Sequence, residues 1–269
     1  ESYSFIDVKD LDDDGEKEFL LLKGSANDSA AMAEAYKLDK NGIYHRYRKD
    51  LSGGFTEFDA VSYGSLNSGE TALYIDAVSG NGYIQTDIVY MNKKGLQKVF
   101  NTAEQSSATL RPSGCRSVDI DRDMSLEIPV QTIAPGYDNA SEGELLWLTK
   151  WFNVDINGQK ELKHISYHSV GDGYTFIFPA KWRDKVTLKR DAINDEIIIC
   201  AYENGEMGRE LMRIYCAEDA ASREDRTASG YMLLQTKGDS AYLAYVSKYD
   251  ETDALAISEA EAAIGFRFN

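Results

Sequence analysis

The sequence predicts a mainly β protein in two parts: a partial β-propeller of about three four-stranded blades over residues 1–168, and a smaller α+β domain over residues 169–269. Three observations predict this fold. A pattern of strand, polar loop, strand and hairpin occurs three times in the first part. The 269 residues include 17 Tyr and only 4 Pro, a composition that favours strands. After residue 168 the repeat stops, and several short strands precede a helical segment at the end of the chain.

The three repeats are visible as similar segments, which begin FIDVKDLDDDGEKEFLLL, FDAVSYGSLNSGETALYI and RSVDIDRDMSLEIPVQTI. Their loop and hairpin glycines recur about every 53 residues, and an insertion, PGYDNASEGE, lengthens the third repeat. Asn41-Gly42 and Asn157-Gly158 are typical of type I′ hairpin turns, in which both central residues need positive φ. A four-stranded repeat of this length is typical of a propeller blade. Because known propellers have at least about four blades, we expect either further blades before Glu1 or an open arc.

The second part begins at the turn-forming residues 171–173. Strands are predicted at YTFIF, DKVTLKRD, EIIICAY, RELMRIYCA, GYMLLQT and AYLAYVS, with a polar connection or short helix at ASREDRTAS. The closing segment, SEAEAAIGF, is predicted to be a helix, since Ser258 and Glu261 have the spacing of a capping box. Strands with few helices predict an α+β arrangement.

The strongest motif is the acidic loop DLDDDGEKE of the first repeat. Acidic residues occupy its positions 1, 3, 5 and 9, and glycine occupies position 6, where a sharp turn favours a residue without Cβ. Calcium prefers six to eight oxygen ligands, and alternate positions of a tight loop direct carboxylates inward. The position 7 ligand would be a backbone carbonyl. The expected calcium ligands are Asp10, Asp12, Asp14, Glu16 (through its carbonyl) and Glu18.

The third repeat contains a similar loop, DIDRDMSLE. Its expected ligands are Asp119, Asp121, Asp123, Ser125 and Glu127. Met124 replaces the glycine and Arg122 adds a positive charge, so a metal site and a metal-free structural loop are both open here. The second repeat keeps the turn but has no carboxylate before Glu70, so no ion is expected there. An acidic, solvated turn is the alternative for the first loop.

These loops resemble the calcium loops of FG-GAP (integrin-α-type) and VCBS propeller repeats, which lie between the first two strands of a blade. The resemblance covers residues 3–168 and rests mainly on the loop of the first repeat. It implies Ca²⁺ as the cofactor, and we expect a structural role, in which ion binding contributes to folding.

A second resemblance covers the last hundred residues. GDGYTFIFPAKWRDKVTLKRD, with Pro179 and Trp182, is similar to the opening of PsbP-like domains in Firmicutes surface lipoproteins. This resemblance implies an α+β sandwich and an extracytoplasmic location, with a lipid anchor upstream on the surface of a Gram-positive cell. It brings no active site with it.

Composition and motifs narrow the function. The net charge of −16 disfavours nucleic acid and anionic lipid as partners, and no segment is long and apolar enough to span a bilayer. Any contact with a membrane is therefore expected through an upstream anchor. Cys115, Cys200 and Cys216 lack zinc-site spacing and are expected as free thiols, with pairing of Cys200 and Cys216 left open.

No sequence motif for catalysis is present, so we do not expect an enzyme. His164 and His168 are too far apart along one strand to share a metal. The sequence predicts a calcium-stabilised surface protein that binds or scaffolds a protein or carbohydrate ligand. One alternative is a carbohydrate-binding or carbohydrate-active protein that uses Trp147, Trp151 and Trp182, although core positions are the more common role of such residues. Another is an assembly subunit that pairs through an exposed strand edge.

Overall fold

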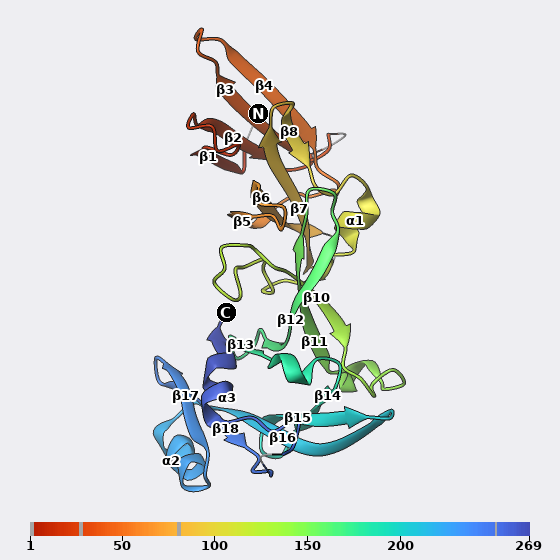
Figure 1. Cartoon of the computed structure of the whole chain (residues 1–269), viewed down its shortest axis with the longest axis vertical. Helices are drawn as coiled ribbons and strands as arrows, with labels where there is room; N and C mark the ends of the chain where they lie inside the picture. The colour runs from red at the N-terminus through yellow and green to blue at the C-terminus, as the bar shows by residue number, and fades with distance from the viewer. Residues whose placement is uncertain (1–2, 27–28, 80–81, 251) are drawn as a thin grey trace. The chain divides into compact units, whose positions relative to one another are not determined.

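The computed structural model describes residues 3–26, 29–79, 82–250 and 252–269. The chain is mainly β, as predicted, and forms several antiparallel sheets (Figure 1). Two compact units are present: Glu1–Val130 with Lys150–Lys163, here called unit 1, and Gln131–Thr149 with His164–Asn269, here called unit 2. The boundary at residues 168/169 was drawn from the repeats and stays a prediction.

The first sheet of unit 1 has the strand order β1-β2-β3-β4. Its strands are β1 (Phe5–Lys9), β2 (Glu18–Lys23), β3 (Met32–Leu38) and β4 (Tyr44–Asp50). The first acidic loop connects β1 to β2, and a turn at Gly42 connects β3 to β4. The predicted type I′ geometry is wrong here and at Gly158, because the glycines have positive φ but Asn41 and Asn157 do not. Alternate residues of the central strands, Leu20, Leu22, Ala33 and Ala35, belong to one hydrophobic cluster, which is the period of two expected of strands.

The second sheet of unit 1 packs against a hydrophobic cluster on each face. Its strands are β5 (Phe58–Ser65), β6 (Thr71–Ser79), β7 (Tyr83–Asn92), β8 (Gly95–Lys98) and β9 (Arg111–Pro112), which pairs with β7. On β6, Leu73 and Ile75 share a core with residues of the first sheet, whereas Ala72 and Tyr74 share another with Leu126 and other residues of the third repeat. Helix α1 (Ala103–Ser107) lies between β8 and β9 in the chain. Both strands are buried on their two faces, and they bury polar side chains (Asp76, Gln85, Thr86 and Asp87) as well as apolar ones.

The third sheet has the order β10-β11-β12-β13-β19. Its strands are β10 (Ile128–Ile133), β11 (Trp147–Val154), β12 (Lys160–Ser169), β13 (Tyr174–Ile177) and β19 (Phe266–Phe268), and the insertion of the third repeat contains a short 3₁₀ helix, η2 (Glu142–Glu144). The strand expected before the third acidic loop is reduced to one bridge, between Val118 and Glu127. Next to this bridge, the Asp76 side chain takes the place of a strand partner: the Ser117 N–H donates to Asp76 Oδ2 at 2.6 Å.

The fourth sheet lies in unit 2 and has the order β14-β15-β16-β18-β17. Its strands are β14 (Val186–Asp191), β15 (Glu196–Glu203), β16 (Glu206–Ala217), β17 (Met232–Lys237) and β18 (Ser240–Val246). The other elements are η3 (Ala180–Trp182), α2 (Ala220–Ala228) and α3 (Glu259–Gly265). The capping box of Ser258 and Glu261 is confirmed. Trp182 is buried, and its Nε1–H donates to the Leu255 carbonyl at 2.7 Å.

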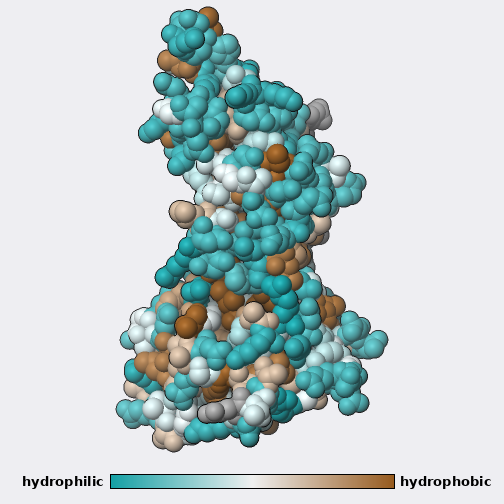
Figure 2. All heavy atoms as spheres, viewed as in Figure 1, coloured by the Kyte–Doolittle hydropathy of each residue, from teal (hydrophilic) through white to brown (hydrophobic). Residues whose placement is uncertain are grey.

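The face drawn in Figure 2 is mostly hydrophilic with scattered hydrophobic residues, in keeping with the acidic composition. In the described part of the chain, every helix is too short or too polar to cross a bilayer.

Candidate metal centre

The first acidic loop is held by hydrogen bonds from its own backbone. Asp10 accepts the N–H groups of Asp14 (3.1 Å) and Gly15 (2.9 Å). Asp14 accepts the N–H of Glu16 at 3.0 Å. These bonds fold the loop into a tight turn that brings alternate carboxylates to one side.

The third-repeat loop has the same hydrogen bonds. Asp119 accepts the N–H groups of Asp123 (3.0 Å) and Met124 (2.9 Å), and Asp123 accepts the N–H of Ser125 (2.8 Å). The two loops therefore form the same turn, although their sequences differ at five of the nine positions.

The loops also agree in their positive φ angles. Positions 4 and 6 have φ of 54° and 91° in Asp13 and Gly15, and of 69° and 75° in Arg122 and Met124. Met124 thus adopts the left-handed conformation that glycine adopts more easily, and its side chain is 79% exposed. The substitution of glycine by methionine strains this loop without changing its shape.

The glutamates that close the two loops are fully buried. Glu18 accepts the N–H of Leu11 at 2.8 Å, and Glu127 accepts the N–H of Ile120 at 2.9 Å. In both cases the bond uses Oε2, which leaves Oε1 for another partner.

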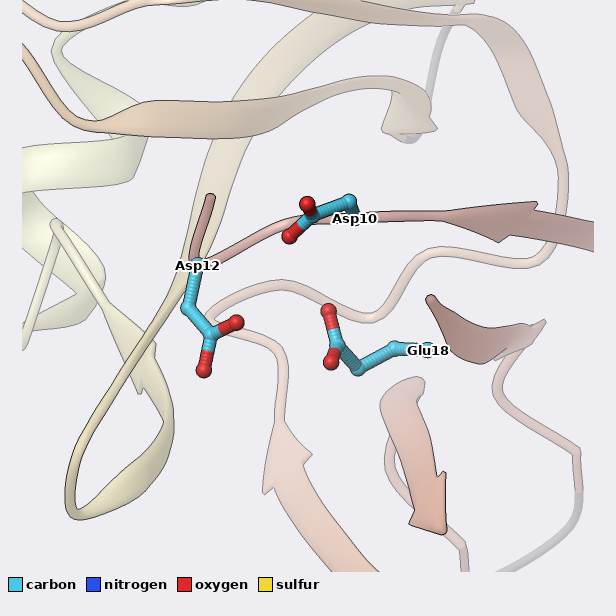
Figure 3. Close-up of side chains that lie close together, drawn as sticks. All are labelled: Asp10, Asp12 and Glu18. Carbon is cyan, nitrogen blue, oxygen red and sulfur yellow. The ribbon is translucent and has the colours of Figure 1, made fainter. Parts of the chain in front are cut away.

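Three carboxylates converge in each loop. Oxygen atoms of Asp10, Asp12 and Glu18 lie within 4.8 Å of one another, and Figure 3 shows these side chains directed toward a common space. Oxygens of Asp119, Asp121 and Glu127 meet the same limit. Both triads could hold a metal ion, and an all-oxygen donor set suits a hard cation. The other predicted ligands, Asp14, Glu16, Asp123 and Ser125, lie outside these triads.

Lys37 on β3 is the residue that sequence reasoning missed. Its Nζ lies 2.7 Å from Asp12 Oδ2, 2.7 Å from Asp14 Oδ2 and 3.0 Å from Glu18 Oε1. Burial lowers the pKa of Lys37, but hydrogen bonds to these carboxylates outweigh burial and raise the pKa above its usual value. The sequence signal that could have identified this contact is the position of Lys37 just before the β3–β4 turn. The register of β2 and β3 places Lys37 opposite Glu18.

The third-repeat loop has a different electrostatic environment. Among the described residues, none forms a hydrogen bond with Glu127 Oε1, which is buried. Burial raises the pKa of Glu127 to about 8; the Ile120 N–H lowers it, while the charges of Asp121, Asp123 and Asp119 raise it further. Lys163 Nζ lies 3.9 Å from Asp123 Oδ2. A buried carboxylate oxygen facing three further carboxylates fits a site for a cation.

Both acidic loops touch the strands of the second sheet. Thr71 Oγ1 donates to Asp13 Oδ2 at 2.9 Å, and the Ser65 N–H donates to the Met124 carbonyl at 3.2 Å. Ser65 and Thr71, the two ends of the β5–β6 connection, therefore each contact one of the acidic loops. An ion bound in either acidic loop would stiffen the packing of neighbouring sheets within unit 1.

The histidines, tryptophans and cysteines discussed from the sequence lie outside the two acidic loops. His164 and His168 lie on β12, and His168 Nδ1 is 2.7 Å from Thr175 Oγ1. Trp151 is buried, whereas Trp147 is 40% exposed, which leaves the carbohydrate alternative one exposed tryptophan on β11. All three cysteines, which fall within the described residues, are free.

No protein-family model and no curated protein matches this chain.

Proposed function

We propose that this protein is a calcium-stabilised extracytoplasmic protein that binds or scaffolds a ligand and performs no catalysis. The observation that carries the proposal is Glu127, a fully buried carboxylate with one oxygen that accepts no hydrogen bond from the described residues. Such a group is costly to bury unless a cation or donor meets it. A divalent ion between Asp119, Asp121 and Glu127 would supply that partner.

Calcium is the ion that this donor chemistry favours. The ligands are carboxylates on a flexible loop, and calcium accepts six to eight oxygens at variable geometry. Magnesium demands near-octahedral geometry and gives up its water reluctantly. Backbone carbonyls and water would complete the shell around the three carboxylates.

The ion would act on stability. Because the third-repeat loop contacts β5 through Ser65 and the core through Leu126, ion binding adds to the folding free energy of unit 1. At a calcium concentration 100-fold above Kd, the added stability is about 2.7 kcal/mol.

The family and location belong to the same proposal. The first sheet, which has four strands and an acidic loop between its first two, supports an FG-GAP or VCBS propeller blade, and the acidic loop before β10 supports a second. An α3 helix and a five-stranded sheet support a PsbP-like domain in the C-terminal part. Together they favour a lipid-anchored protein on a bacterial cell surface, whose ligand is another protein or a carbohydrate.

Thermal unfolding tests the calcium proposal. The melting temperature of the wild type should rise by several degrees between excess chelator and 1 mM CaCl₂, a test concentration chosen on the order of extracellular affinities. Asp121→Asn should remove most of this rise. Asp50→Asn is the matched control, because Asp50 pairs with Arg48 on the surface and removing that charge should leave the rise intact. Equal melting temperatures of the wild type in both conditions would refute a structural ion.

A second candidate function is self-assembly through β1. This strand is an edge of its sheet in the described chain, and Ile6 (59%), Val8 (51%) and the neighbouring Phe19 (41%) are exposed. An antiparallel pair of β1 strands centred on Val8 would set Asp7 opposite Lys9 of a second copy, an arrangement with complementary charge. Light scattering should give a dimer mass for the wild type and a monomer mass for Val8→Lys; a monomeric wild type would exclude this candidate.

A further inference from the structure

We propose that the two acidic loops balance their charge by different means: Lys37 is the resident cation of the first loop, and only the loop of the third repeat takes a divalent ion. The inference rests on the proposed calcium function and assigns the ion to one of two loops with the same backbone.

The first loop already contains a cation in a site of carboxylates. The Lys37 ammonium lies within 3.0 Å of oxygens from Asp12, Asp14 and Glu18. Its Nζ donates to both carboxylate oxygens of Asp12 and to Asp14 Oδ2, and its charge lies 3.0 Å from Glu18 Oε1. A divalent ion that used Asp12 and Glu18 as ligands would have to displace this ammonium, which would then lose its carboxylate partners.

The repeat shows what occupies the same position beside the other loop. The β3–β4 turn and the β11–β12 turn share their hydrogen bonds: the Gly42 N–H donates to the Asp39 carbonyl at 2.9 Å, and the Gly158 N–H donates to the Asp155 carbonyl at 2.9 Å. Asp39 Oδ1 also accepts two backbone N–H groups, as does Asp155 Oδ1. Counting back from these aspartates, the position of Lys37 in the first repeat is that of Asn153 in the third.

Asn153 cannot replace the lysine, because an amide carries no charge. It is 2% exposed, and in the described part of the protein its Oδ1 accepts no hydrogen bond. Glu127 Oε1 also accepts no hydrogen bond from the described residues. Glu18 Oε1 accepts none either, but the Lys37 ammonium lies 3.0 Å from it. The third repeat therefore has two buried oxygens without donors at the positions where the first repeat has a carboxylate and an ammonium. Both oxygens are ligands that calcium accepts.

Exchanging the two side chains tests the assignment. Calcium titration by isothermal calorimetry should give one site per wild-type chain. Lys37→Asn should give two sites, since it removes the resident cation and supplies the residue found in the third repeat. Asn153→Lys should weaken binding at the third-repeat loop by about 10- to 100-fold, the range typical when the surroundings of a metal site are changed. The double exchange should move the single site to the first loop, and Asp12→Asn should then abolish it.

The outcomes separate the two proposals. Two sites in the wild type, or one site in Lys37→Asn, would overturn the assignment while leaving calcium binding in place. No binding by the wild type or any variant would overturn the calcium function and the assignment together. Lys37→Asn could fail to fold without metal; refolding of this variant in CaCl₂ but not in chelator would then support the assignment. If it folds in neither condition, Asn153→Lys decides the question. Unchanged calcium affinity in Asn153→Lys would overturn the assignment.

Discussion

Glu18 and Glu127 close two loops of the same geometry, and both side chains are fully shielded from solvent. Only Glu18 has an ammonium 3.0 Å from its second oxygen. Because the backbone is the same in the two loops, this difference between the glutamates comes from residues outside them. The following predictions use that comparison and the burial of other titratable groups.

Glu127→Gln should raise the melting temperature in chelator and abolish the response to calcium. The amide keeps an oxygen for the Ile120 N–H but removes a charge that burial and three aspartates disfavour. Differential scanning fluorimetry measures both effects, with exposed Glu142→Gln as the control for a lost surface carboxylate. A lower melting temperature in chelator would show that the carboxylate stabilises the metal-free loop.

Met124→Gly should stabilise the protein by about 1 kcal/mol, the cost typical of a non-glycine residue in the left-handed region. Met124 has φ 75° and an exposed side chain, so little packing is lost. Gly15→Ala is the reciprocal change at φ 91° and should destabilise by a similar amount. Urea unfolding of both variants measures the effects, and a shift in the same direction for both would contradict the strain argument.

Asp87 should make stability fall as pH rises. Burial raises its pKa above the ordinary value of 3.8, although Lys98 and the Ser52 N–H lower it. The folded chain therefore keeps this proton to a higher pH than the unfolded chain does. The stability that the protonated group contributes is complete below pH 3.8 and is lost as pH rises through the folded pKa.

Asp87→Asn removes this titration. The difference in unfolding free energy between the variant and the wild type should favour the variant more at pH 7 than at pH 4. Chemical unfolding at both pH values measures this difference. Asp50→Asn, on the surface, provides the control. An equal difference between variant and wild type at the two pH values would contradict the assigned cause.

The three thiols should be inert in the folded protein. Burial raises the pKa of Cys115 to about 12 and that of Cys200 to about 11, and it also raises the pKa of Cys216. At pH 8 each thiol stays protonated, and the thiolate is the reactive form. A thiol-specific dye should react slowly with the native chain and label three sites after denaturation; two missing sites would reveal a disulfide.

Local signals predicted much of the fold. Asn-Gly and Asp-rich turns located the hairpins and the acidic loops, and the spacing of Ser258 and Glu261 located α3. These features depend on residues a few positions apart. The all-β character followed from alternation and composition.

Long-range pairings could not be predicted in this way. Phe266–Phe268 completes the third sheet by pairing with β13, so that Phe268 lies opposite Tyr174. Lys37 reaches the first acidic loop only because β2 and β3 pair in a register that no short motif specifies. The spacing of acidic residues therefore identified two similar loops, while the charge that distinguishes them lies on a neighbouring strand.

The most direct test of the account is an anomalous difference map from crystals grown with millimolar CaCl₂. The account predicts a peak about 2.3–2.6 Å from oxygens of Asp119, Asp121 and Glu127, and the Lys37 ammonium among the carboxylates of the first loop. Density for water alone, or an open turn between Asp119 and Glu127, would contradict it.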